Sequence, residues 1–172
     1  MMEFRREDSG TVSAMFEPVE ADLLRQVAGQ LIRMLESIDT DDPASFSLGT
    51  VSRLLPAAYP DDPEASAEFR RFTADGLLDG KIANARSVIT LLGAEPPDAP
   101  EHDPLPVPVV LEPAAVQSWL RTLTDLRLVI AERLQVDDRG IPRLHDDQSG
   151  FLGEVYDWLG MVQESLVYAI DA

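Results

Sequence analysis

The sequence contains no cysteine. This absence excludes a disulfide framework, a zinc site with cysteine ligands and thiol catalysis. Nor is there an apolar run approaching the roughly 18 residues that a membrane-spanning helix needs. Arg5 and Arg6 are not followed by the apolar stretch of a secretory signal. We therefore expect a cytoplasmic protein that does not enter membranes.

Basic residues are scarce. The chain has 14 Lys and Arg against 31 Asp and Glu, which gives a formal net charge of −17. Proteins that bind nucleic acid use Lys and Arg to replace the counterions of the phosphates. We therefore expect no nucleic-acid partner. A partner protein would have to present a basic or an apolar face to this acidic surface.

Recognisable catalytic and metal-binding motifs are also missing. We find no glycine-rich phosphate loop, no nucleophile elbow and no calcium-binding loop. His102 and His145 each stand beside aspartates, but a zinc site needs three or four converging ligands. The sequence predicts no catalytic residue, no metal site and no cofactor. An enzyme with a site too dispersed to form a motif remains one alternative.

What the chain does have is helical periodicity. In four segments, apolar residues recur every three or four positions, which predicts one buried stripe on each of four helices. These segments are Val19–Ile38, residues 62–92, Val116–Leu134 and Leu152–Ile170. Two of them follow a Glu-Pro pair, and proline suits the first turn of a helix. We expect a mainly α fold, a bundle of about four long helices.

The remaining segments predict smaller elements. Residues 2–16 alternate weakly around Ser9-Gly10, which favours a small N-terminal β-hairpin. Residues 94–112 are proline-rich and predict a surface connection, in which 107–111 is a candidate edge strand. Gly76 and Gly80 suggest a kink or a close helix crossing. We expect a single helical domain over residues 1–172.

Arg127 occupies a stripe position between Leu123 and Ile130, where an apolar residue is expected. A buried guanidinium needs a compensating partner. The candidate carboxylates are those of Asp157, Glu164 and Glu68. The alternatives are a structural ion pair, a side chain that reaches the bundle edge, and a preorganised site for an anion or a peptide terminus.

Two further clusters are candidate binding sites. The first, on the last predicted helix, contains the polar and aromatic residues Tyr156, Asp157, Trp158 and Gln163. Aromatic side chains with polar neighbours are common in partner sites and also fill helical cores. The second combines basic and aromatic residues and could bind an acidic peptide or pair with acids of its own chain. It consists of Arg70 and Arg71 between Phe69 and Phe72, with Arg53 and Tyr59 upstream.

Three stretches together resemble an actinobacterial family of unknown function. They are RLLPAAY at 53–59 leading to EFRRFT at 68–73, WLRTLTDLRL at 119–128, and YDWLG at 156–160. Members of that family are often encoded beside ClpS, the adaptor of the Clp protease, and some are labelled transcriptional regulators. The resemblance implies a link to Clp-dependent proteolysis or its regulation, and it implies no catalytic residue.

These observations favour a non-enzymatic regulatory or adaptor-like protein that binds another protein, with the Clp adaptor machinery as first candidate. The sequence also leaves open the alternative that the protein forms a homo-oligomer. The alternative is a regulator, including a transcriptional regulator, that binds an anion or a small molecule through Arg127.

Overall fold

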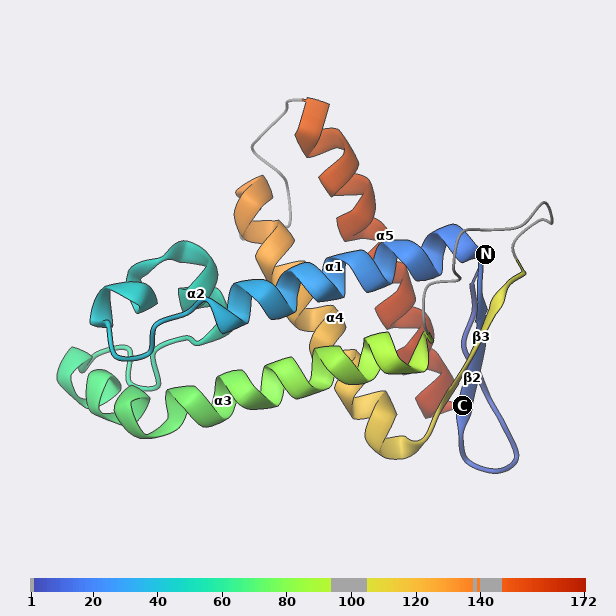
Figure 1. Cartoon of the computed structure of the whole chain (residues 1–172), viewed down its shortest axis with the longest axis horizontal. Helices are drawn as coiled ribbons and strands as arrows, with labels where there is room; N and C mark the ends of the chain where they lie inside the picture. Colours follow the sequence, from blue (N-terminus) through green and yellow to red (C-terminus); the bar gives the residue numbers. More distant parts are fainter. Residues whose placement is uncertain (1, 94–104, 138, 140–146) are drawn as a thin grey trace.

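The structure is a computed structural model and describes residues 2–93, 105–137, 139 and 147–172. His102, His145 and the proline-rich residues 94–104 lie outside this part. The described chain forms a mainly helical fold with a small antiparallel sheet (Figure 1), which confirms the predicted fold class.

The helices begin where the sequence predicts. Pro18, Pro63 and Pro113 each occupy the first turn of a long helix, where the missing N–H has no intrahelical partner. Asp62 accepts a hydrogen bond from the Ala65 amide at 3.0 Å and caps its helix. The α-helices are α1 (Pro18–Glu36), α2 (Gly49–Leu54), α3 (Pro63–Leu91), α4 (Pro113–Leu134) and α5 (Asp147–Asp171), and η1 (Pro43–Ser47) is a 3₁₀ helix.

The sheet has the strand order β1 (Arg5–Arg6), β2 (Val12–Phe16), β3 (Val107–Leu111). Gly10, with φ of +85°, makes the turn between β1 and β2, which confirms the predicted hairpin. The predicted edge strand at 107–111 is also confirmed, since β3 pairs antiparallel with β2 at the sheet edge. An edge position tolerates Pro108, which lacks an amide donor.

Helix α4 lies at the centre of the molecule and contacts α1, α2, α3, α5 and β3. Helices α1 and α3 run side by side across it, α5 packs on another side, and the sheet covers one end (Figure 1). Trp119 of α4 is fully buried against Phe4 and Phe16, with ring centroids 5.9 Å and 5.8 Å away. This aromatic cluster joins the sheet to the helices.

Of the two alternatives predicted at Gly76 and Gly80, a kink or a close helix crossing, the close crossing is wrong. A Cβ atom added at either glycine would meet nothing within 4 Å. The two glycines instead line an open groove between α3 and α4. No neighbouring atom lies close enough there to clash with a side chain at either position.

Candidate functional site

A groove of about 480 Å³ lies between α5 and the N-terminal strand segment, beside the start of α1. We call it the α5 groove. Its lining residues are Met2, Glu3, Phe4, Glu20, Trp158, Met161, Val162, Glu164, Ser165 and Tyr168. The residues come from three elements that are distant in sequence, so the groove depends on tertiary packing.

Two hydrogen bonds hold the N-terminal segment along α5. The Phe4 amide donates to Ser165 Oγ at 2.8 Å, and Arg6 Nη1 donates to the Ile170 carbonyl at 3.0 Å. The second bond satisfies a carbonyl that the end of a helix leaves without an intrahelical partner. Residues 2–4, which lead into β1, are therefore fixed as one wall of the groove.

The groove has an apolar floor and exposed walls. Met2, Phe4 and Val162 are buried. Met161 is 53% exposed and Tyr168 is 73% exposed. Large apolar side chains that stay exposed around a buried apolar floor are typical of surfaces that bind a partner.

The charge of this groove has one sign. Its three charged lining residues, Glu3, Glu20 and Glu164, are all acidic, and Glu3 forms an ion pair with Arg5 at 3.2 Å. Glu20 Oε1 also accepts a long hydrogen bond, 3.4 Å, from Trp158 Nε1, which orients the indole at the rim. The groove is therefore suited to a ligand that is both apolar and cationic.

The structure separates the cluster predicted on the last helix. Trp158 lines the α5 groove, whereas Tyr156 and Gln163 face Arg127 of α4. Asp157 is exposed. The predicted residues therefore do not form one cluster. Trp158 lies on the side of α5 that lines the groove, and Tyr156 and Gln163 lie on the side that faces α4.

The expected carboxylate partner of Arg127 is wrong, because Arg127 pairs with none of Asp157, Glu164 and Glu68. Its Nη1 donates to Gln163 Oε1 at 3.0 Å, and its Cζ lies 4.8 Å from the centre of the Tyr156 ring, in a cation–π contact. Arg127 is only half-buried, so solvent reduces the cost that would otherwise require a counter-charge. Anion binding by Arg127 stays a prediction.

Arg127→Ala is expected to lower the free energy of unfolding by about 1–3 kcal/mol, because a charged hydrogen bond and a cation–π contact are lost. Urea unfolding measures this loss. Arg127→Met, which keeps the apolar stem, should cost less than Arg127→Ala. A loss above about 4 kcal/mol would indicate a buried ion pair after all.

The basic and aromatic cluster divides in a similar way. Arg53 forms an ion pair with Glu132 of α4, so it ties α2 to the central helix. Arg70 stacks on Phe46, with Cζ 5.0 Å from the ring centre, and Arg71 joins it in lining a second groove. Tyr59 packs edge-on against Phe69, with ring centroids 6.2 Å apart. Apart from Arg53, these residues lie near the start of α3, away from the α5 groove.

The sequence alone does not predict one buried ion pair, which joins Asp125 to Lys81. Asp125 of α4 is only 3% exposed, and its Oδ1 accepts a hydrogen bond from Lys81 Nζ at 2.7 Å. Its Oδ2 is buried without a hydrogen-bond partner. Burial raises the pKa of Asp125 above its usual 3.8, although the hydrogen bond and the charge of Lys81 act in the opposite direction.

This raised pKa predicts a pH dependence. Asp125 binds its proton more tightly in the folded state, so its contribution to stability is complete below pH 3.8 and is lost as pH rises through the raised pKa. As pH rises from 3.8 through the raised pKa of Asp125, the free energy of unfolding of the wild type should therefore fall relative to that of Asp125→Asn. Urea unfolding of both proteins at several pH values checks this. A difference that is constant with pH would contradict it.

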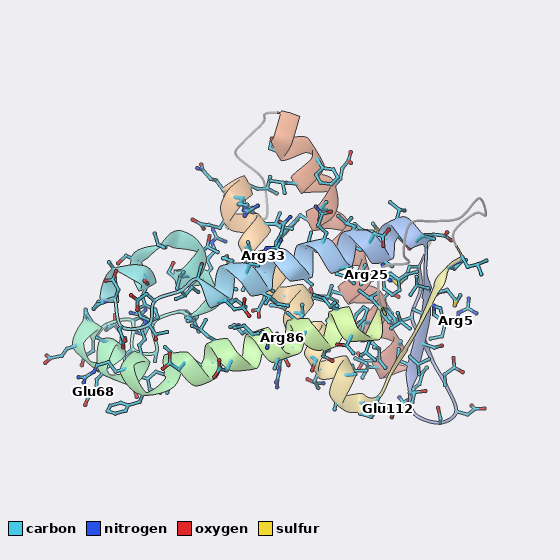
Figure 2. The ribbon with its side chains drawn as sticks, in the orientation of Figure 1. Arg5, Arg25, Arg33, Glu68, Arg86 and Glu112 are labelled. Carbon is cyan, nitrogen blue, oxygen red and sulfur yellow. The ribbon has the colours of Figure 1, made fainter. Side chains whose placement is uncertain are left out.

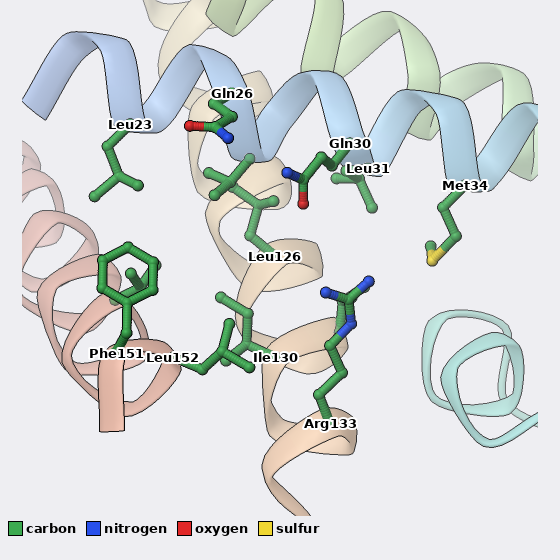
Figure 3. A pocket seen from close by; sticks show the side chains of 13 residues that line it. Leu23, Gln26, Gln30, Leu31, Met34, Leu126, Ile130, Arg133, Phe151 and Leu152 are labelled. Atoms are coloured by element: carbon green, nitrogen blue, oxygen red, sulfur yellow. The ribbon is translucent and has the colours of Figure 1, made fainter. Parts of the chain in front are cut away.

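Another groove lies between α1, α4 and the start of α5 (Figure 3). Its apolar lining includes Leu23, Met34, Ile130 and Phe151, and Arg133 is its one charged lining residue.

Comparison with known proteins places the chain in a family. A family model described as a domain of unknown function, DUF2017, matches residues 1–170. The chain belongs to this family. No solved structure gives a significant match.

Curated relatives in mycobacteria carry a functional name. The chain is 29% identical over 181 residues to proteins of Mycobacterium tuberculosis and Mycobacterium bovis named oxidative stress regulator AosR, covering 89% of this chain and 79% of each relative. It is 26% identical over 186 residues to a putative oxidative stress regulator AosR of Mycobacterium leprae, covering 90% and 80%. These names agree with the regulatory role expected from the sequence, and none of them mentions Clp.

The described helices include none that is both long enough and apolar enough to cross a bilayer.

Proposed function

We propose that this protein is a non-enzymatic regulator of an oxidative stress response, and that it binds a basic amphipathic segment of a partner protein in the α5 groove. The regulatory part of the proposal is supported by the names of the mycobacterial relatives. The binding part rests on one observation, an apolar groove whose charged lining residues are all acidic.

The chemistry of the groove defines the occupant. Leucine-sized side chains would pack on Met2, Phe4 and the exposed Met161, and this burial of apolar surface would supply most of the affinity. Lysine or arginine beside them would meet Glu20 and Glu164, which adds specificity and speeds association. An amphipathic helix carries both kinds of residue on adjacent faces.

The first natural partner to test follows from the family resemblance seen in the sequence. That resemblance implies genes that often lie beside that of ClpS, so the Clp adaptor machinery is the first candidate partner. This candidate comes from the resemblance, and the groove itself specifies the chemistry of a partner and no named protein.

The direct test uses a labelled helical peptide with leucines along one face and lysines on its flanks. Fluorescence anisotropy should show binding that Tyr168→Ala weakens at least about tenfold, because truncating an exposed aromatic anchor removes its contact area. Phe72→Ala is the matched control, since Phe72 is 79% exposed and lies on α3. Loss of binding in Phe72→Ala with none in Tyr168→Ala would place the partner at the far end of α3.

Charge reversals at two glutamates distinguish attraction of the peptide to the α5 groove from its attraction to the acidic protein as a whole. Glu164→Lys and Glu68→Lys change the net charge equally, but Glu68 lies near the start of α3, at the opposite end of the molecule from Arg5 (Figure 2). Glu164→Lys should weaken binding by severalfold and Glu68→Lys hardly at all, since exposed charges beyond about 8 Å are largely screened at physiological salt. Equal effects of the two reversals would show non-specific attraction to an acidic protein.

A further inference from the structure

The sulfur chemistry of this chain is confined to methionine. There is no cysteine among the 172 residues, and there are five methionines. A thioether is oxidised by peroxide to a sulfoxide, which converts a flexible apolar side chain into a polar one. A sulfur atom of this chain that responds to an oxidant must therefore belong to a methionine.

The described methionines differ in access to solvent. Met2 is 8% exposed, whereas Met15 is 54% exposed and Met161 is 53% exposed. Met34 is half-buried. A dissolved oxidant therefore has the best access to Met15 and Met161.

Only one of these two exposed methionines lines the α5 groove. Met161 stands on α5 among Trp158, Val162 and Tyr168, whereas Met15 lies on β2 opposite Pro108 of the edge strand. Oxidation at Met15 would change a sheet surface outside the groove. Oxidation at Met161 would change a wall of the groove.

We propose that Met161 is a reversible oxidation site that controls binding in the α5 groove; this inference rests on the proposed function. Hydrogen peroxide transfers one oxygen to the thioether, so an S–O bond forms as the O–O bond breaks. The sulfur loses two electrons, and the remaining oxygen leaves with two protons as water. The sulfoxide dipole then occupies an apolar wall, and burying it under a partner without a hydrogen bond is unfavourable.

The proposal gives a direction to the response. Peroxide should release the basic amphipathic segment, and methionine sulfoxide reductases should restore binding. A bound segment should in turn shield Met161, so oxidation and binding compete for the same side chain.

The experiment compares the wild type, Met161→Leu and Met15→Leu, each before and after hydrogen peroxide, with the labelled peptide as probe. Peptide mapping by mass spectrometry should find sulfoxide at Met161 and Met15 well before Met2. Wild type and Met15→Leu should lose binding about tenfold or more, and sulfoxide reductases should reverse the loss. Whatever its affinity before treatment, Met161→Leu should bind equally before and after peroxide, because leucine cannot be oxidised.

The outcomes separate this inference from the proposed function. Peptide binding by untreated protein that peroxide leaves unchanged, or a loss that Met161→Leu does not prevent, would overturn the role of Met161 and leave the groove intact as a binding site. Absence of binding by untreated protein would overturn the proposed function and this inference with it. A saturating peptide that slows oxidation at Met161 but not at Met15 supports both.

Discussion

Replacing Trp119 by alanine is expected to lower the free energy of unfolding by about 3–5 kcal/mol, the range typical of truncating a large buried aromatic side chain. Trp119 is the largest of the fully buried side chains in the described chain and has no exposed surface. Its indole packs against Phe4 and Phe16, so the cavity would open where the sheet meets α4. Urea unfolding followed by circular dichroism measures the loss.

Phe72→Ala provides the comparison for Trp119→Ala, because Phe72 is 79% exposed. That variant should stay within about 0.5 kcal/mol of the wild type, as surface substitutions usually do. Since Phe4 also lies in the floor of the α5 groove, Trp119→Ala should weaken peptide binding even when the variant is folded. A change below about 1 kcal/mol in Trp119→Ala would show that the strand segment does not pack on α4 as described.

The second large effect is expected at the buried pair. Lys81→Met removes the ammonium that holds Asp125 and leaves a carboxylate that is 3% exposed without its counter-charge. Removing one partner of a buried pair costs about 3–5 kcal/mol. The cost should shrink at acidic pH, where Asp125 is protonated in both folded and unfolded states.

A double variant distinguishes lost pairing from lost packing. Lys81→Met combined with Asp125→Leu removes both charges, and it should recover most of the stability that Lys81→Met loses. Thermal unfolding at neutral pH compares the two. Equal losses in the single and double variants would mean that the Lys81 side chain stabilises α3 by packing alone.

Local signals in the sequence account for the helices but not for how they assemble. Pro18, Pro63 and Pro113 mark helix starts, and the apolar spacing after each defines a buried stripe. The pairing of Val107–Leu111 with β2 joins segments some 95 positions apart, as in Ala14 opposite Val109, and no local pattern specifies such a partner. The edge strand was therefore predictable, and its position in the sheet was not.

The buried Asp125 was missed for a related reason. A single stripe assumes one buried face per helix, but α4 contacts α1, α2, α3 and α5. Positions beside its stripe, such as Thr122 and Asp125, are buried as well. The α5 groove was equally hidden, since Trp158 was visible as a candidate while Met2, Phe4 and Glu20 join it only through tertiary packing.

The pair between Lys81 and Asp125 also restricts the covalent chemistry open to the protein. Lys81 is the one lysine of the 172 residues, and its ammonium is bonded to a buried carboxylate. Acylation, or conjugation of another protein to a lysine side chain, would first have to release Asp125, so such labelling would accompany a loss of stability. Cross-linkers directed at lysine amines would for the same reason report little about this surface, whereas reagents directed at its many carboxylates would map it.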